Sequence, residues 1–138
     1  MEEKPWTVEE PAREDGARRR LRVLLVDDEA DMLSVLRSWL SPMYEVETLS
    51  AGRQLVDTAL RFRPDLVILD LSLPDADGYD LCRALRGVKA VASVPVLFLT
   101  GRESEVEFLD RRDTGGDGFL QKPVEREQLL SHVRILLR

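Results

Sequence analysis

The stretch that decides the fold is LVILDLSLPDADG at residues 66–78. Its first four residues are aliphatic, which is typical of a central parallel strand because helices cover both faces of such a strand. Asp70 closes the apolar run, and a loop with Pro74, Asp77 and Gly78 follows it. The sequence therefore predicts a buried strand at 66–70 that ends in a carboxylate.

The same alternation of short apolar runs and amphipathic segments continues on both sides of this strand. The other runs predict strands at 21–26, 44–49, 94–100 and 119–121. Helical spacing of apolar residues predicts helices between them and a closing helix at 125–137. We predict an α/β fold, a doubly wound five-stranded parallel sheet in the flavodoxin-like order 2-1-3-4-5, with helices on both faces. The segment 103–114 has few apolar residues, so we expect its helix to be shortened or mobile.

Length and composition predict one folded domain. The chain has 138 residues, of which 43% are hydrophobic and 33% are charged, enough for one hydrophobic core. Residues 1–20 carry many charges and two prolines without periodicity, and we expect a flexible N-terminal arm before a domain at 21–138.

Charge and hydropathy exclude several classes of function. The net charge of −6 argues against direct nucleic-acid binding. No apolar stretch approaches the roughly 20 residues that a membrane span needs, and no secretory signal is visible. We therefore expect a cytoplasmic protein without a membrane span. The single cysteine, Cys82, excludes an internal disulfide and is expected in the core.

Polar residues with complementary chemistry stand at the ends of four predicted strands. They are Asp27 and Asp28 after the first strand, Asp70 after the third, Thr100 after the fourth and Lys122 after the fifth. Because the carboxyl ends of parallel strands meet at one edge of the sheet, these side chains are expected around one crevice.

Such a crevice suits a hard divalent cation and a phosphoryl group. Two carboxylates about 4 Å apart repel by roughly 4 kcal/mol at an effective dielectric near 20, so the cluster needs a cation, a proton or wide spacing. Oxygen ligands favour Mg²⁺, and His132, the only histidine, stands on the closing helix, which argues against zinc. Lys122 and Thr100 could hold phosphoryl oxygens, and a central carboxylate such as Asp70 could attack phosphorus.

Four motifs together give a resemblance to a known family. They are VDDE at 26–29, LVILDLSLPDADG at 66–78, VPVLFLTG at 94–101 and GFLQKP at 118–123. Over residues 21–138 the chain resembles the response-regulator receiver domain of two-component signal transduction, the class to which chemotaxis regulators belong. The 22-residue step from Thr100 to Lys122 is typical of that family.

The resemblance implies a phosphoacceptor with a magnesium ion beside it. By this resemblance Asp70 accepts the phosphoryl group, and Asp28 and Asp70 coordinate Mg²⁺ directly. Asp27 would assist through water, and the backbone carbonyl of Ser72 would be a further metal ligand.

The resemblance also implies a switch. Thr100 would move to hydrogen-bond the phosphoryl group, Lys122 would neutralise it, and the Lys122–Pro123 peptide would be cis. Phe119 occupies the aromatic switch position, whose ring turns inward when Thr100 moves.

The implied function is that of a signalling domain rather than a turnover enzyme, catalysing only its own phosphorylation and dephosphorylation. A histidine kinase or phosphotransfer protein would supply the phosphoryl group. The output would pass to a downstream protein or to an effector domain absent from this chain. Gln128 and His132 replace the acidic and basic residues by which related receivers pair through the last helix, so we do not expect pairing there.

Three alternatives belong to other classes. A phosphohydrolase with an aspartate nucleophile would need a second Asp where this chain has Ser72. A flavodoxin-like cofactor binder would need a phosphate-binding first loop, and the acidic residues 27–29 would repel a phosphate. A phosphorylation-independent interaction domain with a lapsed switch is the third alternative.

Overall fold

The computed structural model describes residues 20–101 and 115–138, and these form a five-stranded parallel sheet in the order β2-β1-β3-β4-β5. The strands are β1 (Arg22–Val26), β2 (Glu45–Leu49), β3 (Leu66–Asp70), β4 (Val96–Thr100) and β5 (Gly118–Gln121). The helices are α1 (Ala30–Leu40), α2 (Leu55–Phe62), α3 (Gly78–Arg86) and α5 (Arg126–Leu136), with short 3₁₀ turns η2 (Gly52–Gln54) and η3 (Lys89–Val91). The predicted sheet order is confirmed. The predicted arm at 1–20, apart from Arg20, and the predicted helix at 103–114 lie outside the described residues.

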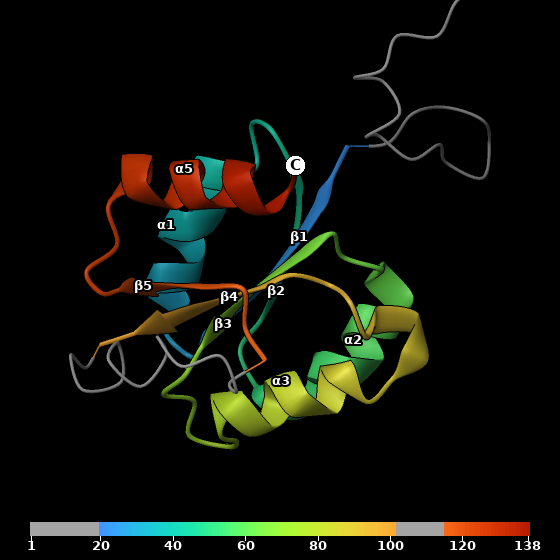
Figure 1. The fold of residues 1–138 in the computed structure, drawn as a ribbon. Helices are drawn as coiled ribbons and strands as arrows, with labels where there is room; N and C mark the ends of the chain where they lie inside the picture. Colours follow the sequence, from blue (N-terminus) through green and yellow to red (C-terminus); the bar gives the residue numbers. More distant parts are fainter. Residues whose placement is uncertain (1–19, 102–114) are drawn as a thin grey trace, which may run out of the picture.

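Helices cover both faces of the sheet (Figure 1). α1 and α5 lie on one face, and α2 and α3 lie on the other. Every residue of β3 is buried, as expected for a central strand, whereas every residue of β2 is only partly buried, as expected for an edge. Among the residues that the structure describes, no helix is long and apolar enough to span a membrane.

Each face has its own apolar cluster, as the alternation of side chains along a strand requires. On β1, Leu24 and Val26 face α2 and α3, while Val23 and Leu25 face α1 and α5. Cys82 is fully buried on the α2–α3 face, so its expected place in the core is confirmed.

One strand begins later than its apolar run. β4 starts at Val96 rather than at Val94, because the Val94 amide donates to the Val91 carbonyl in a turn (3.3 Å) and Pro95 has no amide to donate. The Pro95 carbonyl still accepts a hydrogen bond from the Val67 amide (2.9 Å). The hydrophobic pattern therefore overestimates the length of β4, because the first amide of the apolar run is hydrogen-bonded within a turn.

Candidate functional site

Three carboxylates converge at the carboxyl edge of the sheet. Asp27 and Asp28 follow β1, and Asp70 closes the neighbouring strand β3. Val26 of β1 lies in register with Leu69 of β3, so the residues that follow these two lie side by side. Each of the three carboxylates offers an oxygen within 4.8 Å of the others. Asp27 and Asp70 are only 1% and 2% exposed, whereas Asp28 is exposed. The convergence expected from the strand-end positions is therefore present.

The two buried carboxylates are fixed by backbone amides two residues further along the chain. The Glu29 amide donates to Asp27 Oδ1 at 2.9 Å, and the Ser72 amide donates to Asp70 Oδ1 at 3.0 Å. Asp side chains commonly accept a hydrogen bond from the backbone amide two residues on, an arrangement called an Asx-turn. Each carboxylate keeps its second oxygen, Oδ2, for a cation.

Lys122 is the cation that faces those oxygens. Its Nζ lies 3.1 Å from Asp27 Oδ2, 3.4 Å from Asp70 Oδ2 and 3.3 Å from Glu29 Oε1. The Lys122 amide donates to the Thr100 carbonyl at 2.7 Å, which ties β5 to the end of β4. The Lys122–Pro123 peptide is cis, as the resemblance implied.

Burial and charge compete in setting the pKa values of this group. Burial raises the pKa of Asp27, and hydrogen bonds from the Glu29 amide and Lys122 oppose that rise only in part. For Lys122, burial is the largest single influence and lowers the pKa, but Asp27, Asp70 and Glu29 together outweigh it and raise the pKa. The Lys122 ammonium is therefore charged at neutral pH, and burial is the main reason for the raised pKa of Asp27.

The other predicted residues take different places relative to this group. Thr100 is fully buried at the end of β4, one position beyond the residue that pairs with Asp70. Phe119 is partly buried and packs against the α2–α3 cluster. Ser72 is exposed in the β3–α3 loop. His132 lies on α5, where its Nδ1 is 3.0 Å from the Gln128 carbonyl oxygen, and does not belong to the carboxylate cluster.

The donor set fits a hard divalent cation. All of the clustered ligand atoms are carboxylate oxygens, two of the three groups are buried, and one ammonium does not balance three negative charges. The crevice can therefore hold Mg²⁺, with Lys122 as a second positive charge against a phosphoryl group.

Two contacts were not anticipated from the sequence. The Glu29 carboxylate contacts Lys122, although no role was expected for Glu29. Asp75 hydrogen-bonds the amides of Gly52 and Arg53 across two loops. An aspartate after Pro74 in a loop signals a turn, but nothing in the local pattern identifies a partner more than twenty residues away.

Comparison with known proteins agrees with this geometry. The family model of the response regulator receiver domain matches residues 23–134, and the chain belongs to that family. Receiver domains are signalling domains of two-component systems.

Curated and structural relatives are consistent with this assignment. The chain is 40% identical over 119 residues to the response regulator MprA of Mycolicibacterium vanbaalenii, a match covering 86% of this chain and 51% of the relative. The chain thus spans about half the length of the curated relatives it matches. The chemotaxis response regulator CheY4 of Vibrio cholerae has a similar structure, with a TM-score of 0.78, 30% identity and coverage of 85% of this chain and 98% of CheY4. A putative response regulator of Chloroflexus aurantiacus gives a TM-score of 0.79 at 28% identity, covering 86% and 98% of the two chains.

Proposed function

We propose that this chain is a phosphorylation-activated signalling switch that accepts a phosphoryl group on Asp70. The observation that carries the proposal is the placement of the buried Asp70 carboxylate among two further carboxylates and the Lys122 ammonium. The donor is a histidine kinase or a phosphotransfer protein, as expected for a member of this family.

Each residue has a part in the transfer. Asp28 and Asp70, with Asp27 through water and the Ser72 carbonyl, would hold Mg²⁺, which when bound neutralises charge on the phosphoryl oxygens. One carboxylate oxygen of Asp70 attacks phosphorus, and the bond from phosphorus to the donor breaks, so that the donor leaves with that bonding electron pair. Lys122 then balances the charge of the new aspartyl phosphate.

The same residues would convert the new charge into a change of surface. In the phosphorylated state Thr100 moves to donate a hydrogen bond to the phosphoryl group, and the Phe119 ring turns inward. A change from 1:99 to 99:1 in the two populations needs about 5.5 kcal/mol of differential stabilisation. Several charge-assisted hydrogen bonds at about 1.5–3 kcal/mol each are of that order.

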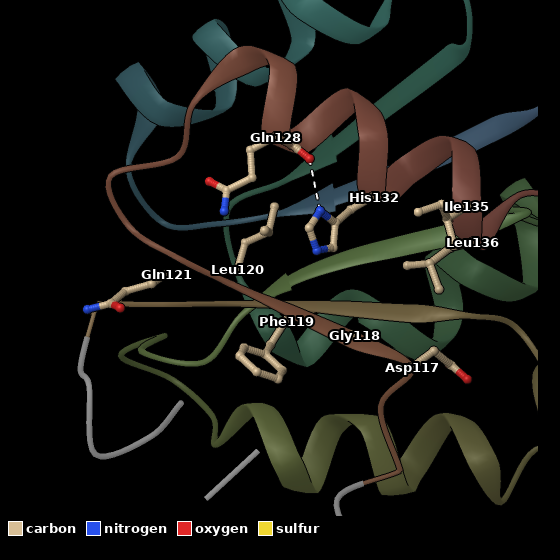
Figure 2. A pocket seen from close by; sticks show the side chains of 9 residues that line it. All are labelled: Asp117, Gly118, Phe119, Leu120, Gln121, Gln128, His132, Ile135 and Leu136. Atoms are coloured by element: carbon tan, nitrogen blue, oxygen red, sulfur yellow. Dashed lines mark hydrogen bonds between the residues drawn. The ribbon is translucent and has the colours of Figure 1, made fainter. Parts of the chain in front are cut away.

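The surface that changes lies beside β5. Figure 2 shows a groove between β5 and α5, with Gln121 at one end of β5 and Asp117 at the other. Ile135 is 55% exposed on its α5 side, and His132 and Gln128 also line it. Phe119 belongs to the strand that borders this groove, but its ring points away from α5 and packs against the α2–α3 cluster (Figure 2), so an inward turn of the ring would alter the surface on the α3 side of β5. A downstream protein, or an effector domain outside this chain, would read that alteration.

The domain organisation follows from the same proposal. Residues 21–138 form the receiver domain and residues 1–20 form an arm. The domain has no substrate to turn over, and it catalyses only its own phosphorylation and dephosphorylation.

Phosphorylation by a small phosphodonor tests the proposal. Incubation with acetyl phosphate and Mg²⁺ should add one phosphoryl group to the wild-type protein, detected by intact mass, and none in EDTA. Asp70→Asn should remain unmodified. Asp77→Asn is the matched control, because Asp77 lies in the loop that follows Asp70. Its side chain caps α3 by accepting a hydrogen bond from the Tyr79 amide (2.7 Å), and an Asn side chain can accept the same hydrogen bond. Equal labelling of Asp70→Asn, or no labelling of the wild type, contradicts the proposal; the latter result favours a phosphorylation-independent interaction domain.

A further inference from the structure

Residues 49–53, here called the bridge segment, contact both of the loops that carry the acidic cluster. At one end, the Leu49 carbonyl accepts a hydrogen bond from the Asp27 amide at 3.1 Å. At the other end, the amides of Gly52 and Arg53 donate to Asp75. The bridge segment supplies no candidate ligand, yet it connects the β1–α1 loop to the β3–α3 loop.

The contact with Asp75 uses both carboxylate oxygens. The Gly52 amide lies 3.0 Å from Oδ1 and the Arg53 amide lies 2.9 Å from Oδ2. These are the first amides of η2, which have no partner within the turn itself. The hydrogen bond from Gly52, and then that from Arg53, lower the pKa of Asp75, so the carboxylate is ionised at neutral pH.

Close packing limits how far the two segments can slide. A Cβ atom on Gly52 would lie 2.6 Å from Leu81 Cδ1 and 3.1 Å from Leu73 Cδ1. The backbone of the bridge segment therefore rests directly on the side chains of the β3–α3 region. The two hydrogen bonds that Asp75 accepts fix both the distance and the orientation of the bridge segment relative to the β3–α3 loop.

The far side of the β3–α3 loop is also fixed. A Cβ atom on Gly78 would lie 2.9 Å from Leu71 Cα and 3.3 Å from the Asp70 carbonyl oxygen, so α3 begins against the end of β3. The Ser72 amide holds Asp70 Oδ1. Between these fixed points, Asp75 supplies the side-chain hydrogen bonds that tie the loop to the bridge segment.

We propose that Asp75 is a positioning residue for the acidic cluster, acting through the bridge segment. It holds the loop that follows Asp70 and bears Ser72 at a set distance from the loop bearing Asp27 and Asp28. Mg²⁺ requires near-octahedral geometry with short bonds, so slack between the two loops weakens its binding. This inference rests on the proposed function, which assigns Mg²⁺ to that cluster.

The test compares two aspartates of similar chemistry. Asp75→Ala removes the hydrogen bonds to Gly52 and Arg53. Asp65→Ala is the matched control, because Asp65 Oδ2 also accepts a hydrogen bond from a backbone amide, that of Arg22 at 2.7 Å, but at the opposite end of the sheet. Asp75→Asn keeps one acceptor oxygen and should be intermediate. Mg²⁺ affinity is measured by NMR titration at low and at high ionic strength, and amide shifts are recorded in metal-free protein.

The expected result is a Mg²⁺ dissociation constant about 10-fold larger in Asp75→Ala, at both ionic strengths, with the control unchanged. In metal-free Asp75→Ala, the amides of Asp27 and Ser72 should shift as well as those of Gly52 and Arg53. Three results would overturn the inference: an unchanged Mg²⁺ affinity in Asp75→Ala, a loss of Mg²⁺ affinity that disappears at high ionic strength, or amide shifts confined to the bridge segment. A wild-type protein that binds no Mg²⁺ would refute the proposed function instead, and the metal-free shifts would still decide whether Asp75 positions the two loops.

Discussion

Neutralising Asp28 should stabilise the protein without metal and reduce the stability gained from Mg²⁺. The Asp28 ligand atom lies within 4.8 Å of those of Asp27 and Asp70. At that distance each pair of charges repels by about 3.5 kcal/mol at an effective dielectric near 20, and by about 0.9 kcal/mol in water. Asp28 is exposed, so the lower figure applies to each of its two pairs, about 1.7 kcal/mol together, and the loss of a carboxylate near the start of α1 subtracts about 0.3–1 kcal/mol. We expect Asp28→Asn to be about 1 kcal/mol more stable in EDTA.

Bound Mg²⁺ should cancel this difference. At a concentration ten times its dissociation constant, Mg²⁺ stabilises the wild type by about 1.4 kcal/mol. If the loss of one ligand weakens affinity about tenfold, the same concentration stabilises Asp28→Asn by only about 0.4 kcal/mol. Urea unfolding with and without Mg²⁺ measures both effects.

Asp31→Asn is the control for this prediction. Asp31 lies in the first turn of α1, so its neutralisation removes a charge close by but outside the cluster. It should cost about 0.3–1 kcal/mol equally with and without Mg²⁺. The reasoning fails if Asp28→Asn is less stable than the wild type in EDTA, or if it gains as much from Mg²⁺ as the wild type does.

Three further predictions concern the buried charges and the packing of the site. Lys122→Met leaves two buried carboxylates without their cation and should cost about 3 kcal/mol in urea unfolding at pH 7 without metal; an unchanged midpoint would show that the ammonium is not needed. Burial raises the folded-state pKa of Asp27 above its ordinary value of 3.8, so the carboxyl destabilises the folded protein as pH rises through that pKa. Any stability gained by Asp27→Asn in EDTA should therefore be larger at pH 7 than at pH 3. An equal gain at both pH values would contradict this. Gly78→Ala should cost about 1–3 kcal/mol in thermal unfolding because its Cβ meets the Leu71 backbone at 2.9 Å, whereas Gly101→Ala, whose Cβ has no atom of residues 20–101 or 115–138 within 4 Å, should change little; similar losses would refute the packing argument.

Much of the fold follows from the sequence because strand burial leaves a plain signal. Four consecutive aliphatic residues before Asp70 indicate a strand covered on both faces, and β3 is buried throughout. The start of β4 was less predictable, because the Val94 amide is taken by a turn that hydrophobicity does not register. The helix expected at 103–114 lies outside the described residues, so its shortening stays a prediction.

The convergence of the site residues was predictable for a topological reason. Parallel strands end at one edge and β1 neighbours β3, so Asp27 and Asp70 were expected close together once the strand order was known, whereas Lys122 follows β5, beyond β4, and reaches them with its long side chain. The contacts of Glu29 and Asp75 could not be predicted in this way. They depend on the side-chain conformation and on the distance between loops, which the hydrophobic pattern does not encode. The roles in phosphoryl transfer, from Ser72 as a metal ligand to Phe119 as a switch, stay predictions.

The central claim is that Asp70 accepts a phosphoryl group and that Thr100 and Phe119 respond. Titration with beryllofluoride and Mg²⁺, which together mimic the aspartyl phosphate, tests it most directly when followed by two-dimensional NMR. The account predicts saturable, Mg²⁺-dependent shifts at Asp70, Thr100 and Phe119 in the wild type and none in Asp70→Asn. Identical spectra with and without the mimic, or the same shifts in Asp70→Asn, would contradict it.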